Sequence, residues 1–234
     1  MKHVFVILLL CAYGFAAVTR DGSCASRQLN HCLSGFSATN TGSLKIVFSW
    51  NEVFGSPPSL PSGWTNIATG SGGTSFWRMG CNVSSSSADT GTGTWTNASV
   101  VVRISYSGTG AISTANCNTT GVGNNSSDGP GGDADFSCHS ITMTGTNWVA
   151  CFGGNPNNSI CTPSGLTQVV TAFGSTNNGI GLDTNAPVST FSTATCSNPG
   201  ATWSSATVEI KGASPSGHCG SCDISKAENP FKEK

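Results

Sequence analysis

The residues of this chain that could hold a metal ion gather in one glycine-rich stretch, which contains Asp128, Asp133 and Asp135. Hard cations such as calcium bind clustered carboxylate and carbonyl oxygens on flexible backbone, so these aspartates are the candidate metal site and calcium is the cofactor they would take. Their spacing matches no calcium-loop signature. A solvated acidic loop without metal explains the same residues, and the sequence favours that alternative.

Aromatic side chains offer a second kind of chemistry, because a flat apolar ring can stack on the CH face of a sugar. Of the 6 tryptophans, Trp64, Trp77 and Trp95 lie near turns and are the candidate ligand-binding residues. The others lie in or beside strand-like segments, where core packing explains them: Trp50, Trp148 and Trp203. Core packing is also the alternative for the first three.

Hydrolytic chemistry has weaker support. Glycoside hydrolysis needs two carboxyl groups about 5 to 10 Å apart, and folding could bring together Glu52, Asp89, Asp128, Asp133, Asp135, Asp183 and Glu209. Glu209 alternates with Val208 and Ile210, which predicts a solvated sheet face for its side chain. The chain has no Gly-x-Ser-x-Gly elbow, and a Ser/His/Asp triad would have to form in space from His31, His139 or His218. We therefore assign no catalytic residue.

The N-terminus has the pattern of a secretory signal peptide at residues 1–16. Lys2 and His3 precede an apolar run over residues 4–12, and small residues follow at 14 and 16, as a signal peptidase requires. The run is shorter than the roughly 20 residues of a bilayer span. We expect a secreted or cell-surface protein that keeps no membrane segment after cleavage.

Cysteine usage agrees with export. Of the 11 cysteines, Cys11 lies in the predicted signal peptide. An even number then remains, which predicts disulfide bonds in an exported protein, at Cys24, Cys32, Cys81, Cys117, Cys138, Cys151, Cys161, Cys196, Cys219 and Cys222. Spacing does not settle the pairing. A scheme of mostly local loops joins Cys24 with Cys32, Cys117 with Cys138, Cys151 with Cys161, Cys219 with Cys222, and Cys81 with Cys196.

The motif Cys219-Gly220-Ser221-Cys222 has the spacing of a redox pair. No βαβ pattern surrounds it, so a structural or intermolecular disulfide is favoured, and zinc bound together with His218 is a weaker alternative because exported cysteines are usually oxidised.

The elements that must position these residues are short strands. The segment from Val100 to Tyr106 is the strongest candidate, because its β-branched residues pack well across the interior of a sheet. Alternation assigns Val102, Ile104 and Tyr106 to a buried face and the polar residues between them to the other face. Further strands are expected at 44–50, 62–67, 74–79, 140–144, 147–152, 166–173, 180–183, 188–191 and 206–211.

Many short strands separated by turn residues predict an all-β protein, an antiparallel β-sandwich of jelly-roll type that disulfides stabilise. No internal repeat is evident. We expect a cysteine-containing arm at 17–42, the sandwich at 43–212, including a long polar loop at 109–135, and a cysteine-containing tail at 213–234.

Charge excludes two classes of partner. Only 9% of the residues are charged, with 10 Lys and Arg against 11 Asp and Glu, whereas about 25% is typical of globular domains. Nucleic acid and anionic membranes are bound through a basic surface. We therefore expect neither as a partner.

Several turn-plus-strand pieces resemble a known kind of sandwich. They are Pro61-Ser62-Gly63-Trp64-Thr65, Thr94-Trp95 before the strand at 98–106, and, in the second half, Asn147-Trp148-Val149, Pro163-Ser164-Gly165-Leu166-Thr167 and Val208-Glu209-Ile210. Over residues 44–211 the chain resembles jelly-roll-like sandwiches of bacteriophage tails and secreted bacterial proteins of unknown role. The resemblance implies an adhesion, surface or fibre module without catalytic motifs. The many cysteines depart from that pattern.

The sequence thus predicts a secreted or surface β-sandwich that acts as a binding or structural module, for glycans or as a subunit of an extracellular assembly. Its expected partners are a glycan, another surface protein or copies of itself. The alternative is an extracellular hydrolase that acts on polysaccharide or ester bonds.

Overall fold

The computed structural model describes residues 17–27, 31–32, 40–52, 54–72, 74–86, 91–131, 135–156, 160–197 and 203–214. The side chains of residues 72 and 127–131 lie outside this description. The predicted signal peptide and the motif from Cys219 to Cys222 also lie outside it and stay predictions. In the described part of the chain, no helix is long and apolar enough to cross a bilayer.

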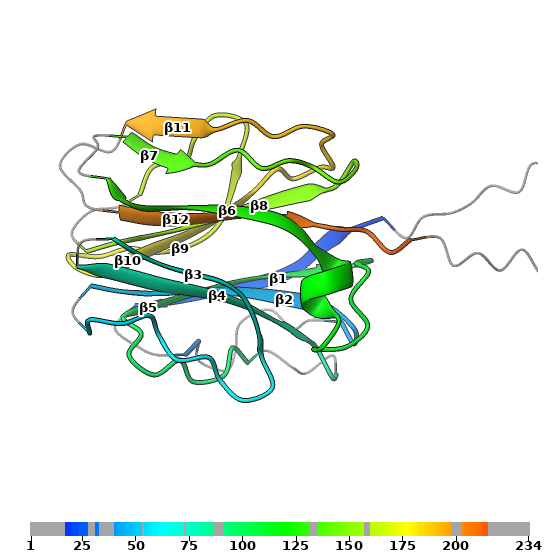
Figure 1. Ribbon diagram of the computed structural model, residues 1–234, viewed down its shortest axis with the longest axis horizontal. Helices are drawn as coiled ribbons and strands as arrows, with labels where there is room; N and C mark the ends of the chain where they lie inside the picture. The colour runs from blue at the N-terminus through cyan, green and yellow to red at the C-terminus, as the bar shows by residue number, and fades with distance from the viewer. Residues whose placement is uncertain are drawn as a thin grey trace, which may run out of the picture.

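The protein is an antiparallel β-sandwich, as the sequence predicts, with two five-stranded layers (Figure 1). The first sheet has the order β1-β5-β2-β4-β3 and consists of β1 (Thr19–Arg27), β2 (Leu44–Asn51), β3 (Thr65–Gly72), β4 (Ser75–Val83) and β5 (Val100–Ser107). The second has the order β6-β12-β8-β10-β9 and consists of β6 (Val122–Gly131), β8 (Trp148–Asn155), β9 (Thr167–Ala172), β10 (Asn178–Asp183) and β12 (Trp203–Ile210). A small outer sheet pairs β7 (Asp135–Cys138) with β11 (Ala194–Ser197).

The two large sheets have the same topology, and each is built from one half of the chain. Numbered in chain order within its own sheet, each set of strands has the order 1-5-2-4-3. Their registers also agree: Thr65 pairs with Cys81 before an irregularity that follows Asn66, and Thr167 pairs with Asp183 before one that follows Gln168. The sandwich is therefore an internal structural repeat, although no repeat is evident in the sequence.

The main core lies between the two sheets. At its centre Phe48 of β2 stacks on Phe152 of β8, with ring centroids 6.1 Å apart. These two residues hold equivalent places in the repeat, since Phe48 pairs with Met79, two residues before Cys81 in β4, and Phe152 pairs with Gly181, two residues before Asp183 in β10. The core face of β8 is glycine where a large ring crosses it, because a Cβ on Gly154 would lie 2.4 Å from Trp50 Cγ. A large ring on one sheet therefore packs against a residue without a side chain on the other sheet.

Strand β5 is buried on both faces, which corrects the expectation of one buried face. Val102, Ile104 and Tyr106 face the core between the sheets. On the other face Val101 packs with Val47 and with Trp95, which comes from the segment before β5, and Arg103 is also buried. The alternating pattern predicts that this outer face is exposed to solvent, but a segment folded over the outside of the sheet covers it.

The expected long loop at 109–135 contains regular structure. The π-helical turn η1 (Cys117–Gly121) follows the first sheet, and β6 then pairs with β12. Residues 19–27, expected to belong to a separate arm, form β1 and pair with β5. Both segments are edge strands, in which backbone hydrogen bonds to one neighbour suffice without an apolar side-chain pattern.

Smaller differences concern the ends of the predicted strands. The segments at 140–144 and 188–191 form only isolated bridges, between Ile141 and Phe191 and between Asn147 and Val188. Strand β3 begins at Thr65 rather than at residue 62, because the preceding residues form a turn in which Trp64 N donates to Pro61 O at 3.2 Å.

Four disulfides lie in the described part of the chain, and they confirm one predicted pair. Cys24 bonds to Cys32 as expected. The other observed pairs are Cys81–Cys117, Cys138–Cys151 and Cys161–Cys196, so the predicted pairs Cys117–Cys138, Cys151–Cys161 and Cys81–Cys196 are wrong. Spacing along the chain fails to predict the pairing because the fold decides which cysteines meet: Cys81 of β4 bonds to Cys117 at a sequence separation of 36, and Cys196 of β11 bonds to Cys161 at a separation of 35.

Candidate ligand-binding cleft

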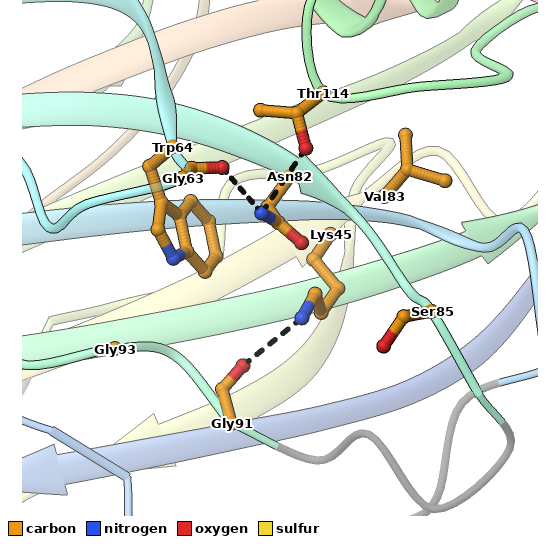
Figure 2. A pocket seen from close by; sticks show the side chains of 9 residues that line it. All are labelled: Lys45, Gly63, Trp64, Asn82, Val83, Ser85, Gly91, Gly93 and Thr114. Atoms are coloured by element: carbon orange, nitrogen blue, oxygen red, sulfur yellow. Dashed lines mark hydrogen bonds between the residues drawn. The ribbon is translucent and has the colours of Figure 1, made fainter.

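An open polar cleft of about 400 Å³ lies on the outer face of the first sheet. Its floor comes from β2 and β4, and its walls come from the turn before β3, the segment between β4 and β5, and the segment before η1. Figure 2 shows the lining residues, which are Lys45, Gly63, Trp64, Asn82, Val83, Ser85, Gly91, Gly93 and Thr114. We call this site the Trp64 cleft.

Trp64 is held at the wall of the cleft by close packing. Its ring meets that of Trp95 edge to face, with centroids 5.6 Å apart, and buried Trp95 is itself fixed because its Nε1 donates to Thr92 O at 2.8 Å. Gly93, at φ +68°, lets the chain pass the ring, since a Cβ there would lie 3.1 Å from Trp64 Nε1. The indole of Trp64 is only partly buried, so a fixed aromatic surface remains accessible.

Lys45 supplies a cation beside this ring. Its Nζ lies 5.4 Å from the centroid of the Trp64 ring, within the range of a cation–π contact, and donates to Gly91 O at 3.4 Å. The side chain extends from β2 on the outer face, because its neighbours Leu44 and Ile46 belong to the core between the sheets. Lys45 is 3% exposed, so its ammonium is a largely buried hydrogen-bond donor at the floor of the cleft.

Asn82 supplies the complementary acceptor. Its Nδ2 donates to Gly63 O at 2.6 Å and to Thr114 Oγ1 at 3.3 Å. A carbonyl oxygen can only accept, which settles which end of the amide faces Gly63. The Oδ1 atom therefore points the other way, on the side of Lys45 (Figure 2). A ligand that donates a hydrogen bond finds a fixed acceptor there.

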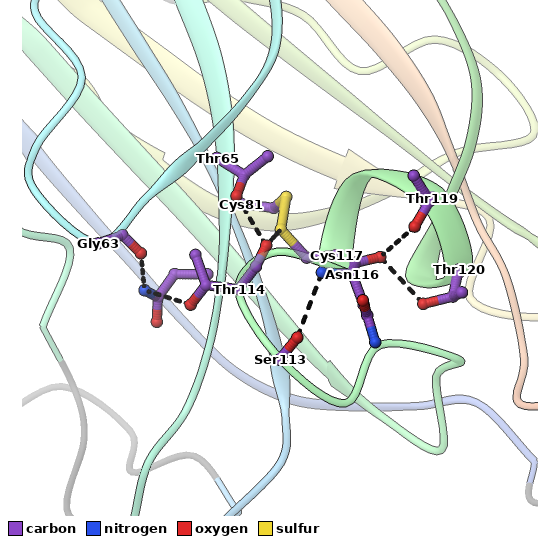
Figure 3. The surroundings of a disulfide bond; sticks show 10 residues. Gly63, Thr65, Cys81, Ser113, Thr114, Asn116, Cys117, Thr119 and Thr120 are labelled. Atoms are coloured by element: carbon purple, nitrogen blue, oxygen red, sulfur yellow. Dashed lines mark hydrogen bonds between the residues drawn. A yellow bond between two sulfur atoms is a disulfide. The ribbon is translucent and has the colours of Figure 1, made fainter.

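Thr114 keeps the amide in place, and a disulfide keeps Thr114 in place (Figure 3). The Thr114 carbonyl accepts a hydrogen bond from Thr65 Oγ1 at 2.7 Å and one from Cys117 N at 3.3 Å. The bond between Cys117 and Cys81 ties this segment to β4, next to Asn82. The polar wall of the cleft is therefore organised before any ligand arrives.

Of the three tryptophans predicted to bind ligand, only Trp64 lies at an accessible site. Trp77 and Trp95 are buried, which corrects the expectation for both. Trp77 faces the core together with Met79 and Cys81, as the alternation along β4 could have indicated, and its ring centroid lies 5.8 Å from that of Phe48. The polar partners Lys45 and Asn82 carry no sequence signal that separates them from other polar residues of the strands; Lys45 is in fact buried.

The predicted calcium site lies largely outside the described residues. Asp133 and the side chain of Asp128 are not described, and Asp135 is exposed at the start of β7. Within the described ranges, no group of three His, Cys, Asp or Glu side chains converges to hold a metal ion. Calcium binding by these aspartates stays a prediction.

Glu209 is buried, which corrects its expected place on a solvated face. One carboxylate oxygen accepts hydrogen bonds from Thr144 N at 2.8 Å and from Asn147 Nδ2 at 2.7 Å. The other accepts from Asn124 N at 3.2 Å. This carboxylate joins the segment before β8 to β6, so its role is structural.

Asp183 is buried as well and is bound by residues of the other sheet. Its carboxylate forms an ion pair with Arg20 of β1 at 2.9 Å and accepts a hydrogen bond from Tyr106 Oη of β5 at 3.3 Å. Burial raises the pKa of Asp183, although Arg20 acts in the opposite direction. None of the described residues that line the Trp64 cleft is acidic, so neither buried carboxylate serves that site.

Fold and site together define a disulfide-bonded antiparallel β-sandwich with an aromatic, hydrogen-bonding cleft on one outer face. The chain matches no protein-family model, no curated protein and no solved structure.

Proposed function

We propose that this protein is a secreted or cell-surface module that binds glycans in the Trp64 cleft. The observation that carries the proposal is the combination around Trp64: a fixed, accessible indole with the Lys45 donor and the Asn82 acceptor beside it. Sugars present apolar CH faces ringed by hydroxyl groups that donate and accept, so a ring with flanking polar groups suits them. The open shape of the cleft suits an extended chain better than a small enclosed ligand.

Two further features support an extracellular location. Disulfides form and persist mainly in oxidising compartments, and four are present in the described part of the chain. The N-terminal sequence has the pattern of a signal peptide. Mass spectrometry of the exported protein tests this part of the proposal, because it should find a mature chain that begins near residue 17.

Binding is tested with purified oxidised protein and a panel of cellulose, xylan, mannan, β-1,3-glucan and chitin in pull-down assays. We expect Trp64→Ala to weaken retention on the polysaccharide that binds by at least about 30-fold, as for other central aromatic residues of binding sites. Trp64→Phe should keep part of the affinity. The matched control is Phe54→Ala, which removes an aromatic side chain that is 49% exposed and lies outside the cleft.

The same panel tests the hydrolase alternative, which stays a prediction. Release of reducing sugar from any polysaccharide by the wild-type protein would replace the binding module with an enzyme. Binding that Trp64→Ala and Phe54→Ala weaken equally would refute the assignment to this cleft.

A further inference from the structure

A second cleft occupies the equivalent place in the other half of the molecule. It has a volume of about 430 Å³, close to that of the Trp64 cleft. Its lining includes Ser164 and Gly165 from the turn before β9, Thr184 after β10, Phe191 from the segment that leads into β11, and Thr195 of β11.

The turns that border the two clefts are alike. Pro163-Ser164-Gly165 repeats Pro61-Ser62-Gly63, and the two glycines have φ angles of +85° and +79°. Leu166 N donates to Pro163 O at 3.3 Å, matching the 3.2 Å bond from Trp64 N to Pro61 O. The same local structure therefore leads into β9 and into β3.

The strand beside each turn also corresponds. Thr167 pairs with Asp183 as Thr65 pairs with Cys81, so the next residue along each strand, Thr184 or Asn82, holds the same position. Both line their clefts. Thr184 is fixed as Asn82 is, because its Oγ1 donates to Ala186 O at 2.7 Å and accepts from Val149 N at 3.2 Å.

The aromatic group comes from a different position in the second cleft. Leu166 replaces Trp64 and packs against the apolar cluster beneath β7 and β11. Phe191, which is partly buried, lines the cleft instead. The remaining lining is rich in hydroxyl groups, and its described residues include no charged side chain. This chemistry fits a neutral sugar, held by ring stacking and hydroxyl hydrogen bonds.

The two clefts lie on opposite outer sides of the sandwich. Lys45 and Asn82 extend outward from the first sheet, whereas the second cleft is lined by Ala194 and Thr195 of β11, which lies outside the second sheet (Figure 1). One short ligand cannot reach both.

We propose that the second cleft, which we call the Phe191 cleft, is a second glycan-binding site, so that one molecule binds two glycan chains. The proposal rests on the function proposed above for the Trp64 cleft. A protein with one site on each face cross-links neighbouring polysaccharide chains, and its affinity for a dense surface exceeds that of either site alone because the second contact is intramolecular.

The test uses the polysaccharide that retains the protein in the pull-down assays. Its hexasaccharide is titrated in a calorimeter, and turbidity is measured after the protein is mixed with a soluble form of the polymer. Each wild-type chain should bind two hexasaccharides and precipitate the polymer. Phe191→Ala and Trp64→Ala should each leave one bound hexasaccharide and abolish precipitation. Thr195→Arg, at an exposed position, should block the Phe191 cleft without removing packed side chains, and light scattering checks that every variant keeps the oligomeric state of the wild type.

A wild-type stoichiometry of one, with Thr195→Arg unchanged, would overturn the second site while leaving the first in place. Loss of all binding in Trp64→Ala would do the same. If Trp64→Ala binds as the wild type does, the failure lies with the Trp64 cleft itself, and Thr195→Arg then decides separately whether the Phe191 cleft is the site. Absence of binding to every probe overturns both proposals.

Discussion

The ion pair between Arg20 and Asp183 joins the two sheets and gives the sharpest stability prediction. Arg20 Nη1 lies 2.9 Å from one oxygen of Asp183 and 3.0 Å from the other. The Arg20 side chain is 30% exposed, whereas that of Asp183 is fully buried. Replacement of Arg20 by Met keeps the aliphatic stem but leaves a buried carboxylate without its cation.

The size of the effect follows from what remains around Asp183. Breaking a fully buried pair costs about 3–5 kcal/mol, because the remaining charge is uncompensated. Here Arg20 is partly solvated, and Asp183 keeps hydrogen bonds from Tyr106 Oη at 3.3 Å and Asn185 N at 2.9 Å. We therefore expect Arg20→Met to lower the free energy of unfolding by about 2–3 kcal/mol at pH 7.

The loss should depend on pH in one direction. Burial already raises the pKa of Asp183 above the ordinary value of 3.8, and removal of the nearby cation raises it further. An acid whose pKa is higher in the folded state stabilises the fold fully below its unfolded pKa, and this stability is lost as the pH rises through the folded pKa. The cost of Arg20→Met should thus be small near pH 3 and reach its full size above the raised pKa.

Urea unfolding of the oxidised protein at pH 3, 5 and 7 measures both quantities. The matched control is Arg27→Met on the same strand, since Arg27 Nη1 donates to the exposed carbonyl of Thr176 at 3.1 Å and forms no ion pair with any residue that the structure describes. It should cost about 0.5–1 kcal/mol at every pH. Equal losses for the two variants at pH 7, or an Arg20→Met loss that does not change with pH, would refute this account.

Three other predictions concern the core and the disulfides. Burial raises the pKa of Tyr106 well above 10, and Tyr106 is the sole tyrosine in a chain without the signal peptide. Absorbance at 295 nm should therefore show no phenolate until the fold is lost above pH 10. A tyrosine titration near pH 10 in the folded protein would contradict this. Gly154→Ala should cost about 1–3 kcal/mol in urea unfolding, because its Cβ would lie 2.4 Å from Trp50 Cγ, and a loss below about 0.5 kcal/mol would show that the sheets move apart freely. The double variant Cys81→Ser and Cys117→Ser opens a loop with a sequence separation of 36 and should lose about 3–4 kcal/mol, whereas an unchanged thermal midpoint would mean that the bond does not constrain the unfolded chain.

Interior strands with branched apolar residues were predictable from the sequence, whereas two edge strands of the large sheets, β1 and β6, were not. The alternation in Val100 to Tyr106 and in Leu44 to Trp50 marks β5 and β2 because these strands need apolar side chains to fill the core. The edge strands β1 and β6 are polar or glycine-rich, and their positions depend on backbone hydrogen bonds to partners far along the chain. Local pattern carries no information about such partners.

The candidate site was predictable only in part for a related reason. Trp64 follows a Pro-Ser-Gly turn, which indicates an accessible position, but Trp95 also comes shortly after a glycine and is buried, because it packs on Val47 and Val101 at the outer face of the first sheet. Asn82 acquires its role from Gly63 and Thr114, neither of which is its neighbour in sequence. The repeat is also not evident in the sequence, because its two halves agree in strand register but differ in most residue types.

A protease can cut the segment between the two repeats without separating them. Ile112 there is 80% exposed, so the peptide bonds around it are open to a protease. Cys117, a few residues further on, is bonded to Cys81 in the preceding repeat. A molecule nicked after Ile112 would therefore migrate as one species on a non-reducing gel and separate into two fragments only when this disulfide is reduced, so a single cut there does not release either half.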